Sequence, residues 1–341
     1  MNDAWVPCSD GARARQDSLV ATGSHGDRWF LVENQAGWGR HALLDPPFDP
    51  ALGRAIVHRI EGAGIRPLAI RRPGRRVTQT GTRWALADSR PGQESVRWGR
   101  VADVRDLLDV PLDGSAGTLS DRPVLAVCAH GRHDRCCAVR GRVVAARLAA
   151  AYPEETWECS HLGGDRFAGT MVLLPHGLYY GWADDADAAA IVDAYLAGRV
   201  DPRFLRGRSA YSHPVQAAQH FARAERGDDS LDAYAPLHEE RTADGWSVQL
   251  STPDGPITVR LVETQSEPLL STCAATRALP VGRWTLAGLT GVEEPSGAPA
   301  SPSTAVGHSS RSGDRPLRSS QSAGSRTAHG DQESRPPRPV Q

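Results

Sequence analysis

The chain has 341 residues, and its 39 basic residues, all arginine, nearly balance 40 acidic ones to leave a formal net charge of -1. A charge this close to zero provides no overall attraction for nucleic acid, so we expect no nucleic-acid partner. The first residues hold no apolar run typical of a signal peptide, and no stretch approaches the roughly 20 apolar residues that span a bilayer, which predicts a cytoplasmic protein without a membrane partner.

The first 118 residues predict a unit built from strands and helices. An apolar, aromatic run at 27–33 is typical of a buried strand, and residues 50–61 place apolar side chains at the spacing of an amphipathic helix. Further strands are expected at 66–70, 83–88 and 95–101, and a short helix at 104–108.

The next segment, residues 119–200, repeats this order of elements. On its first helix, Val139 and Val143 share one apolar face. A β-α-β unit followed by a hairpin and a helix is the order of a thioredoxin-like domain, and its crossover helix implies a parallel central pair of strands. The expected elements are a buried strand at 123–127, a helix at 138–152, a brief strand at 156–158, a hairpin around Pro175-His176-Gly177, and a helix between Asp184 and Gly198.

The rest of the chain differs from both units. Residues 214–226 have the pattern of an exposed amphipathic helix, and three strand-like runs beginning at Trp246, Pro256 and Arg283 predict a small appended sheet. Residues 292–341 are rich in Ser, Gly, Pro and Arg, and such a segment cannot bury enough apolar surface to offset its ordering entropy.

The predicted fold class is therefore α/β, with tandem thioredoxin-like domains, a small C-terminal β appendage and a disordered tail. The predicted boundaries are 1–118 for a first unit without a metal cluster, 119–200 for the second unit, 201–291 for a helix plus the β appendage, and 292–341 for the tail.

Four of the six cysteines fall between positions 128 and 159. In a chain without an export signal, clustered cysteines more often bind metal or carry out redox chemistry than form a disulfide framework. Cys8 and Cys273 are isolated in the sequence, and we expect each to be a free buried cysteine.

Two loops that follow predicted strands carry the candidate ligands. Cys128 begins the first loop and Cys137 ends it, where the positive end of the helix dipole favours a thiolate. His161 and Asp165 follow the next strand and are separated by two glycines that let the backbone bend closely. Because loops after neighbouring parallel strands emerge at one edge of a sheet, both can reach one small group, and thiolate plus imidazole ligands suit zinc or iron-sulfur centres.

In combination, the segments CAHG, HLGGD and RFAG, with eight residues between Cys128 and Cys137, resemble the thioredoxin-like ferredoxins grouped as sucrase/ferredoxin-like proteins. The resemblance implies a [2Fe-2S] cluster, with Cys128 and Cys137 on one iron and the loop that starts at His161 holding the other. Relatives place a second histidine or cysteine where this chain has Asp165. Asp165 is therefore the predicted fourth ligand, and Cys159 is the alternative.

The predicted function is electron transfer or redox sensing by one [2Fe-2S] cluster with mixed Cys and His ligation, in an electron carrier rather than a stand-alone enzyme. Histidine ligation predicts a reduction potential above that of all-cysteine ferredoxins and dependent on pH. A redox partner protein is expected. Two alternatives remain: a zinc-binding structural or regulatory module that uses Cys128, Cys137, Cys159 and His161, and a metal-free thiol oxidoreductase.

The remaining residues of the first loop have simpler interpretations. Adjacent residues at a helix start point in different directions, so Cys136 is interpreted as a small buried residue or a spare thiol. His130 and His133 are interpreted as loop histidines whose hydrogen bonds are satisfied within the loop, with hydrogen bonding to cluster sulfurs as the alternative.

Overall fold

A computed structural model of the chain describes residues 6–74 and 80–291. Within those two ranges, no helix is long and apolar enough to cross a membrane. The predicted disordered tail, 292–341, lies outside the described residues.

The N-terminal part of the fold has the predicted order of elements. An apolar strand is followed by a helix whose N-cap, Asp49, accepts hydrogen bonds from two backbone N–H groups of the first turn. Ahead of these elements lies a short helix that the sequence pattern did not predict. The elements are α1 (Cys8–Ala14), β1 (Arg28–Glu33), α2 (Pro50–Gly62), β2 (Arg66–Arg71), β3 (Thr82–Asp88), β4 (Ser95–Val101), η1 (Val104–Leu108) and β5 (Thr118–Ser120).

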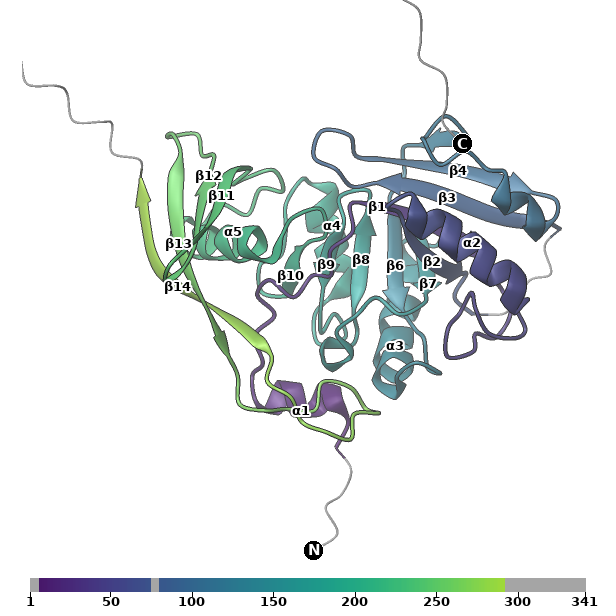
Figure 1. Ribbon diagram of the computed structural model, residues 1–341, viewed down its shortest axis with the longest axis horizontal. Coiled ribbons are helices and arrows are strands. Elements are labelled where there is room, and N and C mark those ends of the chain that lie inside the picture. Colours follow the sequence, from purple (N-terminus) through teal and green to yellow (C-terminus); the bar gives the residue numbers. More distant parts are fainter. Residues whose placement is uncertain (1–5, 75–79, 292–341) are drawn as a thin grey trace, which may run out of the picture. The chain divides into compact units, whose positions relative to one another are not determined.

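The following part repeats the order of strand, helix, strand and hairpin, as predicted. Its first two strands are parallel and its hairpin is antiparallel. Its elements are β6 (Val124–Cys128), α3 (Arg135–Ala151), β7 (Thr156–Cys159), η2 (Asp165–Phe167), β8 (Met171–Leu174), β9 (Leu178–Tyr180), α4 (Ala188–Leu196) and β10 (Leu205–Arg208). Figure 1 shows β6 and β8 side by side, with α3 beyond the end of β6.

All ten strands form one continuous mixed sheet, in the order β10-β9-β8-β6-β7-β2-β1-β3-β4-β5. The two parts are joined where β2 pairs with β7 in antiparallel orientation. The sheet is strongly curled. Four strands lie between β1 and β9 in the sheet, yet the rings of Trp29 on β1 and Tyr179 on β9 are only 6.2 Å apart. A single apolar core fills the concave face and draws side chains from both parts.

The strand order on each side of this junction is the same. A parallel pair is followed outward by an antiparallel hairpin in β2-β1-β3-β4 and again in β7-β6-β8-β9. The α/β class is therefore confirmed, whereas the thioredoxin-like identity of each part and the proposed boundaries stay predictions.

The buried face of α3 differs from the apolar face that the sequence indicates. Val139 and Val143 are 60% and 44% exposed, whereas Gly141, Val144 and Leu148 face the sheet. The reason lies at Gly141, where a Cβ would come within 1.8 Å of the Cys128 carbonyl oxygen. The helix therefore approaches the strand through its glycine rather than through its valines.

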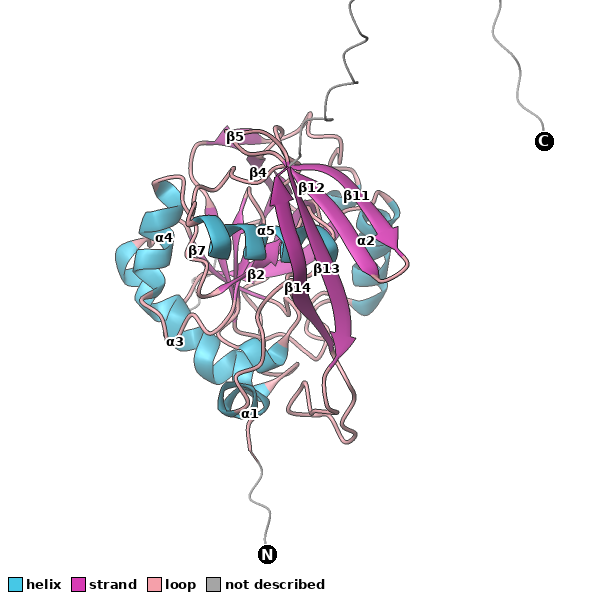
Figure 2. Ribbon diagram, turned by 90° about the vertical axis from the view of Figure 1, so that its left-hand side faces the viewer, coloured by secondary structure: helices cyan, strands magenta, loops and turns pink. Residues whose placement is uncertain are grey.

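The C-terminal part forms a second, antiparallel sheet, as predicted, but it has four strands rather than three, because the strand at Pro236–Thr242 was not expected. The helix before it is more buried than expected, because it packs against strands of both sheets (Figure 2). These elements are α5 (His213–Arg226), β11 (Pro236–Thr242), β12 (Gly245–Leu250), β13 (Ile257–Gln265) and β14 (Gly282–Gly291). In Figure 1 the chain between β13 and β14 reaches α1.

Candidate metal centre

The first candidate ligands lie at the two ends of the loop that joins β6 to α3. Cys128 is the last residue of β6, and Cys137 lies in the first turn of α3. The helix begins here because the Asp134 carboxylate accepts a hydrogen bond from the Cys136 backbone N–H at 2.8 Å. Both thiols are 2% exposed, so the loop presents two buried sulfurs to one another.

The other candidate ligands follow β7. Cys128 and Cys159 are direct partners in the parallel β6–β7 ladder, so the two loops leave the same edge of the sheet, as the sequence predicts. His161 comes two residues beyond the ladder, and η2 begins at Asp165. Gly163 and Gly164 between them have positive φ values of 94° and 78°, which glycine adopts without strain.

A buried arginine holds this glycine turn in place. Arg206 on β10 is 2% exposed and donates hydrogen bonds to the carbonyl oxygens of Gly163 and Thr22 at 2.9 and 2.5 Å. A Cβ at Gly164 would lie 2.4 Å from its guanidinium. Arg206 therefore fixes the loop that carries His161 and Asp165, although the sequence pattern did not single it out.

The structure brings the four predicted residues together. The ligand atoms of Cys128, Cys137 and His161 lie within 4.8 Å of one another. Asp165 Oδ1 lies 3.2 Å from Cys137 Sγ, which donates to it, and 3.1 Å from His161 Nδ1. His161 Nδ1 thus faces the Asp165 carboxylate at ion-pair distance, and the imidazole lies beside both sulfurs.

The two thiols differ in their affinity for a proton. Two neighbours lower the pKa of Cys128, although burial opposes this. The larger cause is a hydrogen bond with Cys137, and the second is the adjacent His161. The same hydrogen bond, together with burial, raises the pKa of Cys137. Ionisation is therefore favoured at Cys128 rather than at Cys137, the position that the helix dipole alone would favour.

Opposite charges also favour the ionised forms of His161 and Asp165. Burial by itself would lower the pKa of His161, but the Asp165 carboxylate and the Cys128 sulfur outweigh it and raise that pKa to about 9. Burial opposes ionisation of Asp165, yet His161 lowers the pKa of its carboxyl group. The site thus gathers two sulfurs, an imidazole and a carboxylate, a donor set that binds transition metals.

One comparison with known proteins identifies the family of this chain. The family model for sucrase/ferredoxin-like proteins matches residues 21–207 of the chain. This chain belongs to the sucrase/ferredoxin-like family. No curated protein and no solved structure gives a match. The resemblance inferred from the three short segments is therefore confirmed, and the buried Cys, His and Asp residues of this family member can hold a metal ion.

Two further polar residues of the sucrase/ferredoxin-like chain adjoin this centre, and the sequence did not predict either as a ligand. The ring of His133 stacks on that of His161 with centroids 3.7 Å apart, and His133 Nε2 lies 4.0 Å from Asp165 Oδ2. Asp134 has a carboxylate oxygen within 4.8 Å of the ligand atoms of Cys137 and Asp165. Only the folded loop places these residues beside the centre.

The remaining residues of the two loops have separate environments. His130 Nε2 donates to the Gly39 carbonyl oxygen at 2.7 Å, and its Nδ1 is buried without a hydrogen bond. Cys159 is fully buried in the concave core. It is absent from the groups of ligand atoms found among residues 6–74 and 80–291, and its role as the alternative fourth ligand stays a prediction.

The close contact between α3 and β6 gives a prediction about stability. Gly141→Ala should lower the free energy of unfolding by about 1–3 kcal/mol, because the new methyl group must push α3 away from Cys128. Gly62→Ala is the matched control, since a Cβ there meets no atom within 4 Å and alanine favours the helix. Urea denaturation compares the two variants, and equal effects would show that the contact carries no strain.

Proposed function

We propose that this protein binds one [2Fe-2S] cluster and serves as an electron carrier or redox sensor. Cys128 and Cys137 would hold one iron, and His161 and Asp165 the other. When bound, the cluster accepts and releases a single electron. The observation that carries the proposal is the convergence of two buried sulfurs, from Cys128 and Cys137, with the imidazole of His161 within 4.8 Å of one another.

The chain's own residues would set the properties of this centre. An imidazole ligand carries less negative charge than a thiolate, which favours the reduced form and raises the reduction potential above that of all-cysteine ferredoxins. The side chain of His161 is 26% exposed, whereas both cysteines are buried. His161 is therefore the ligand nearest to a docked partner, and titration of its ring would make the potential fall as pH rises.

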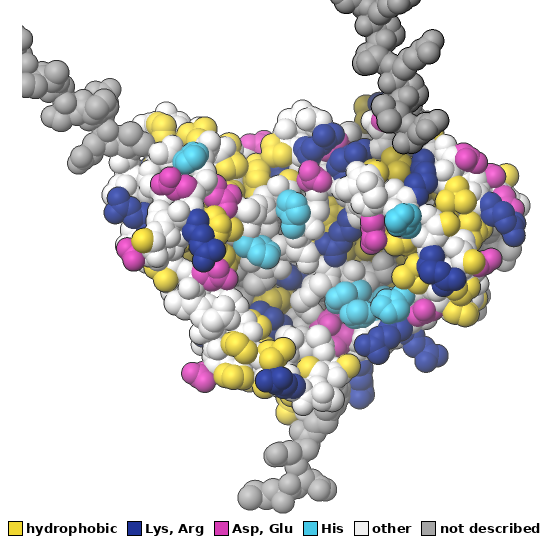
Figure 3. All heavy atoms as spheres, viewed as in Figure 1, with side chains coloured by type: hydrophobic (Ala, Val, Ile, Leu, Met, Phe, Trp, Pro, Cys, Tyr) yellow, Lys and Arg dark blue, Asp and Glu magenta, His cyan; other side chains and the backbone are white. Residues whose placement is uncertain are grey.

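We further propose that the partner is a redox protein with an acidic face. A hollow of about 820 Å³ lies beside the first loop and is lined in part by Trp38 and His130. Four arginines also line it. Arg71 is paired with Glu158 at 2.8 Å, and the other three would attract an acidic surface: Arg40, Arg132 and Arg142. Figure 3 shows histidine side chains beside arginine side chains over the region where β6 ends and α3 begins.

Anaerobic purification of the full chain tests the cluster. We expect about two irons and about two acid-labile sulfides per chain, with visible absorption and, after reduction, a paramagnetic resonance signal. A protein that holds neither iron nor sulfide, as purified and after reconstitution with both, would contradict the proposal. A potential that does not change with pH in a loaded sample would contradict histidine ligation.

A further inference from the structure

A second group of ligand atoms lies next to the centre described above, and Asp134 borders both. Cys8 comes from α1, Cys136 from the first turn of α3, and Cys273 from the chain between β13 and β14. These three sulfurs and a carboxylate oxygen of Asp134 all lie within 4.8 Å of one another. The two cysteines that are isolated in the sequence are therefore neighbours in the fold, and both lie beside Cys136.

The distances between the sulfurs fit a shared metal ion. Cys8 Sγ lies 3.8 Å from Cys136 Sγ and 3.6 Å from Cys273 Sγ, and the third pair is 3.3 Å apart. Zinc–sulfur bonds of about 2.3 Å in a tetrahedral site place the sulfurs about 3.8 Å apart. A disulfide requires about 2.05 Å, and three thiols can form only one disulfide, which leaves the third without a partner.

Asp134 is oriented as a fourth ligand would be. Both of its carboxylate oxygens lie 4.0 Å from Cys8 Sγ. One oxygen accepts from the backbone N–H of Cys136 at 2.8 Å and the other from that of Cys273 at 2.7 Å. Hydrogen bonds of this kind fix a carboxylate ligand and leave lone pairs for a metal. The carboxylate is thus held by two of the three segments that meet here.

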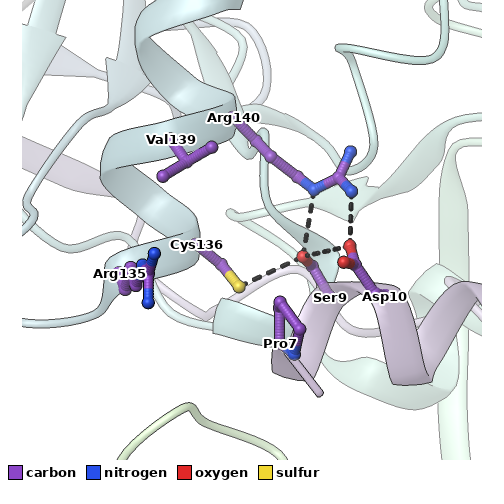
Figure 4. Close-up of a pocket in the computed structure, with 7 residues that line it drawn as sticks. All are labelled: Pro7, Ser9, Asp10, Arg135, Cys136, Val139 and Arg140. Carbon is purple, nitrogen blue, oxygen red and sulfur yellow. Dashed lines mark hydrogen bonds and ion pairs between the residues drawn. The ribbon is translucent and has the colours of Figure 1, made fainter. Parts of the chain in front are cut away.

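The group also has supporting hydrogen bonds, and one of its sulfurs, that of Cys136, borders a cavity. Ser9 Oγ donates to Cys136 Sγ at 3.1 Å and accepts from Arg140 Nε at 3.1 Å. Figure 4 shows this chain of contacts, with the sulfur of Cys136 pointing toward Ser9 beside a cavity of about 130 Å³. A hydroxyl donor stabilises thiolate charge, and the cavity is wide enough to admit an ion.

We propose that Cys8, Asp134, Cys136 and Cys273 bind one tetrahedral divalent metal ion of the zinc type. Three thiolates and one carboxylate fill the coordination shell, so the site is structural rather than catalytic. Binding releases the protons of the thiols, which go to solvent, and no electron is transferred. The ion would tie α1 and the β13–β14 connection to the start of α3, and one of its ligands, Cys136, is the chain neighbour of Cys137 in the first centre.

The wild-type chain provides the first test. We expect about one zinc per chain in protein purified anaerobically with zinc present, and an X-ray absorption spectrum with about three sulfur neighbours near 2.3 Å and one oxygen neighbour. This measurement needs no variant, so a folding defect cannot obscure it. A disulfide between any two of the three cysteines in this anaerobic sample, or an adventitious zinc with only oxygen and nitrogen neighbours, would overturn the proposal.

Variants then separate this site from the iron-sulfur centre. Cys8→Ala and Cys273→Ala should each weaken zinc binding more than about tenfold, while Cys159→Ala, the buried-cysteine control, should leave it unchanged. In a Cys137→Ala background, titration with Co²⁺ should still saturate at about one equivalent with an intense sulfur-to-cobalt absorption. Zinc content that is insensitive to Cys8→Ala and Cys273→Ala would contradict the assignment, whatever the state of the iron.

Discussion

Cys137→Ala is expected to lower the iron and acid-labile sulfide content of anaerobically purified protein to less than about a tenth of the wild-type value. Cys137 Sγ lies within 4.8 Å of Cys128 Sγ and of a ring nitrogen of His161, and 3.2 Å from Asp165 Oδ1. In the proposed cluster, removing this sulfur would leave one iron with a single cysteine, and Cys136 lies in a different group of candidate ligands. Iron, sulfide and visible absorption are measured per folded chain.

Cys136, the residue before Cys137, supplies the matched control for this loss of iron and sulfide. Cys136→Ala removes a thiol of equal burial from the same helical turn, 3% exposed against 2% for Cys137. It should retain iron and sulfide and lose zinc, whereas Cys137→Ala should retain zinc. If both variants lost the same metals to the same extent, a general folding defect would explain the result and the assignment of two separate centres would fail.

The fold is predictable from sequence wherever apolar runs and turn residues act locally. The buried strands at Arg28–Glu33 and Val124–Cys128 and the β8–β9 hairpin follow from such runs. Helix α1 has only seven residues and depends on distant contacts, such as the bond from Arg140 to Ser9, so its own sequence gives no signal. Strand β10, with the sequence LRGR, was missed because its buried residues include arginines.

The candidate centre shows the same limit. Cys128 and His161 could be placed together because β6 and β7 are parallel neighbours, a consequence of the β-α-β order. Spacing could not show that Cys8 and Cys273 meet, because 265 positions separate them and the contact depends on how the second sheet packs. Nor could it show the exposure of Val139, because the packing face of α3 is decided by one glycine contact.

Asp165→Ala is expected to make the cluster far more labile, with a loss of iron and sulfide at least about tenfold faster than in wild type when a chelator is added. The carboxylate lies 3.1 Å from His161 Nδ1, and the positive field of His161 lowers its pKa, so it is ionised and available as a ligand at neutral pH. Asp165→Cys should restore retention, because a thiolate has the same charge and is a softer ligand for iron.

Two further variants decide whether another residue supplies the fourth ligand instead. Cys159→Ala and His133→Ala should keep the wild-type rate of loss, because Cys159 is packed in the concave core and His133 stacks against His161 rather than replacing Asp165 beside it. A loss of visible absorption in Cys159→Ala with none in Asp165→Ala would assign the ligand to Cys159. The same pattern in His133→Ala would place two histidines on the outer iron and leave Asp165 as a hydrogen-bond acceptor that orients His161.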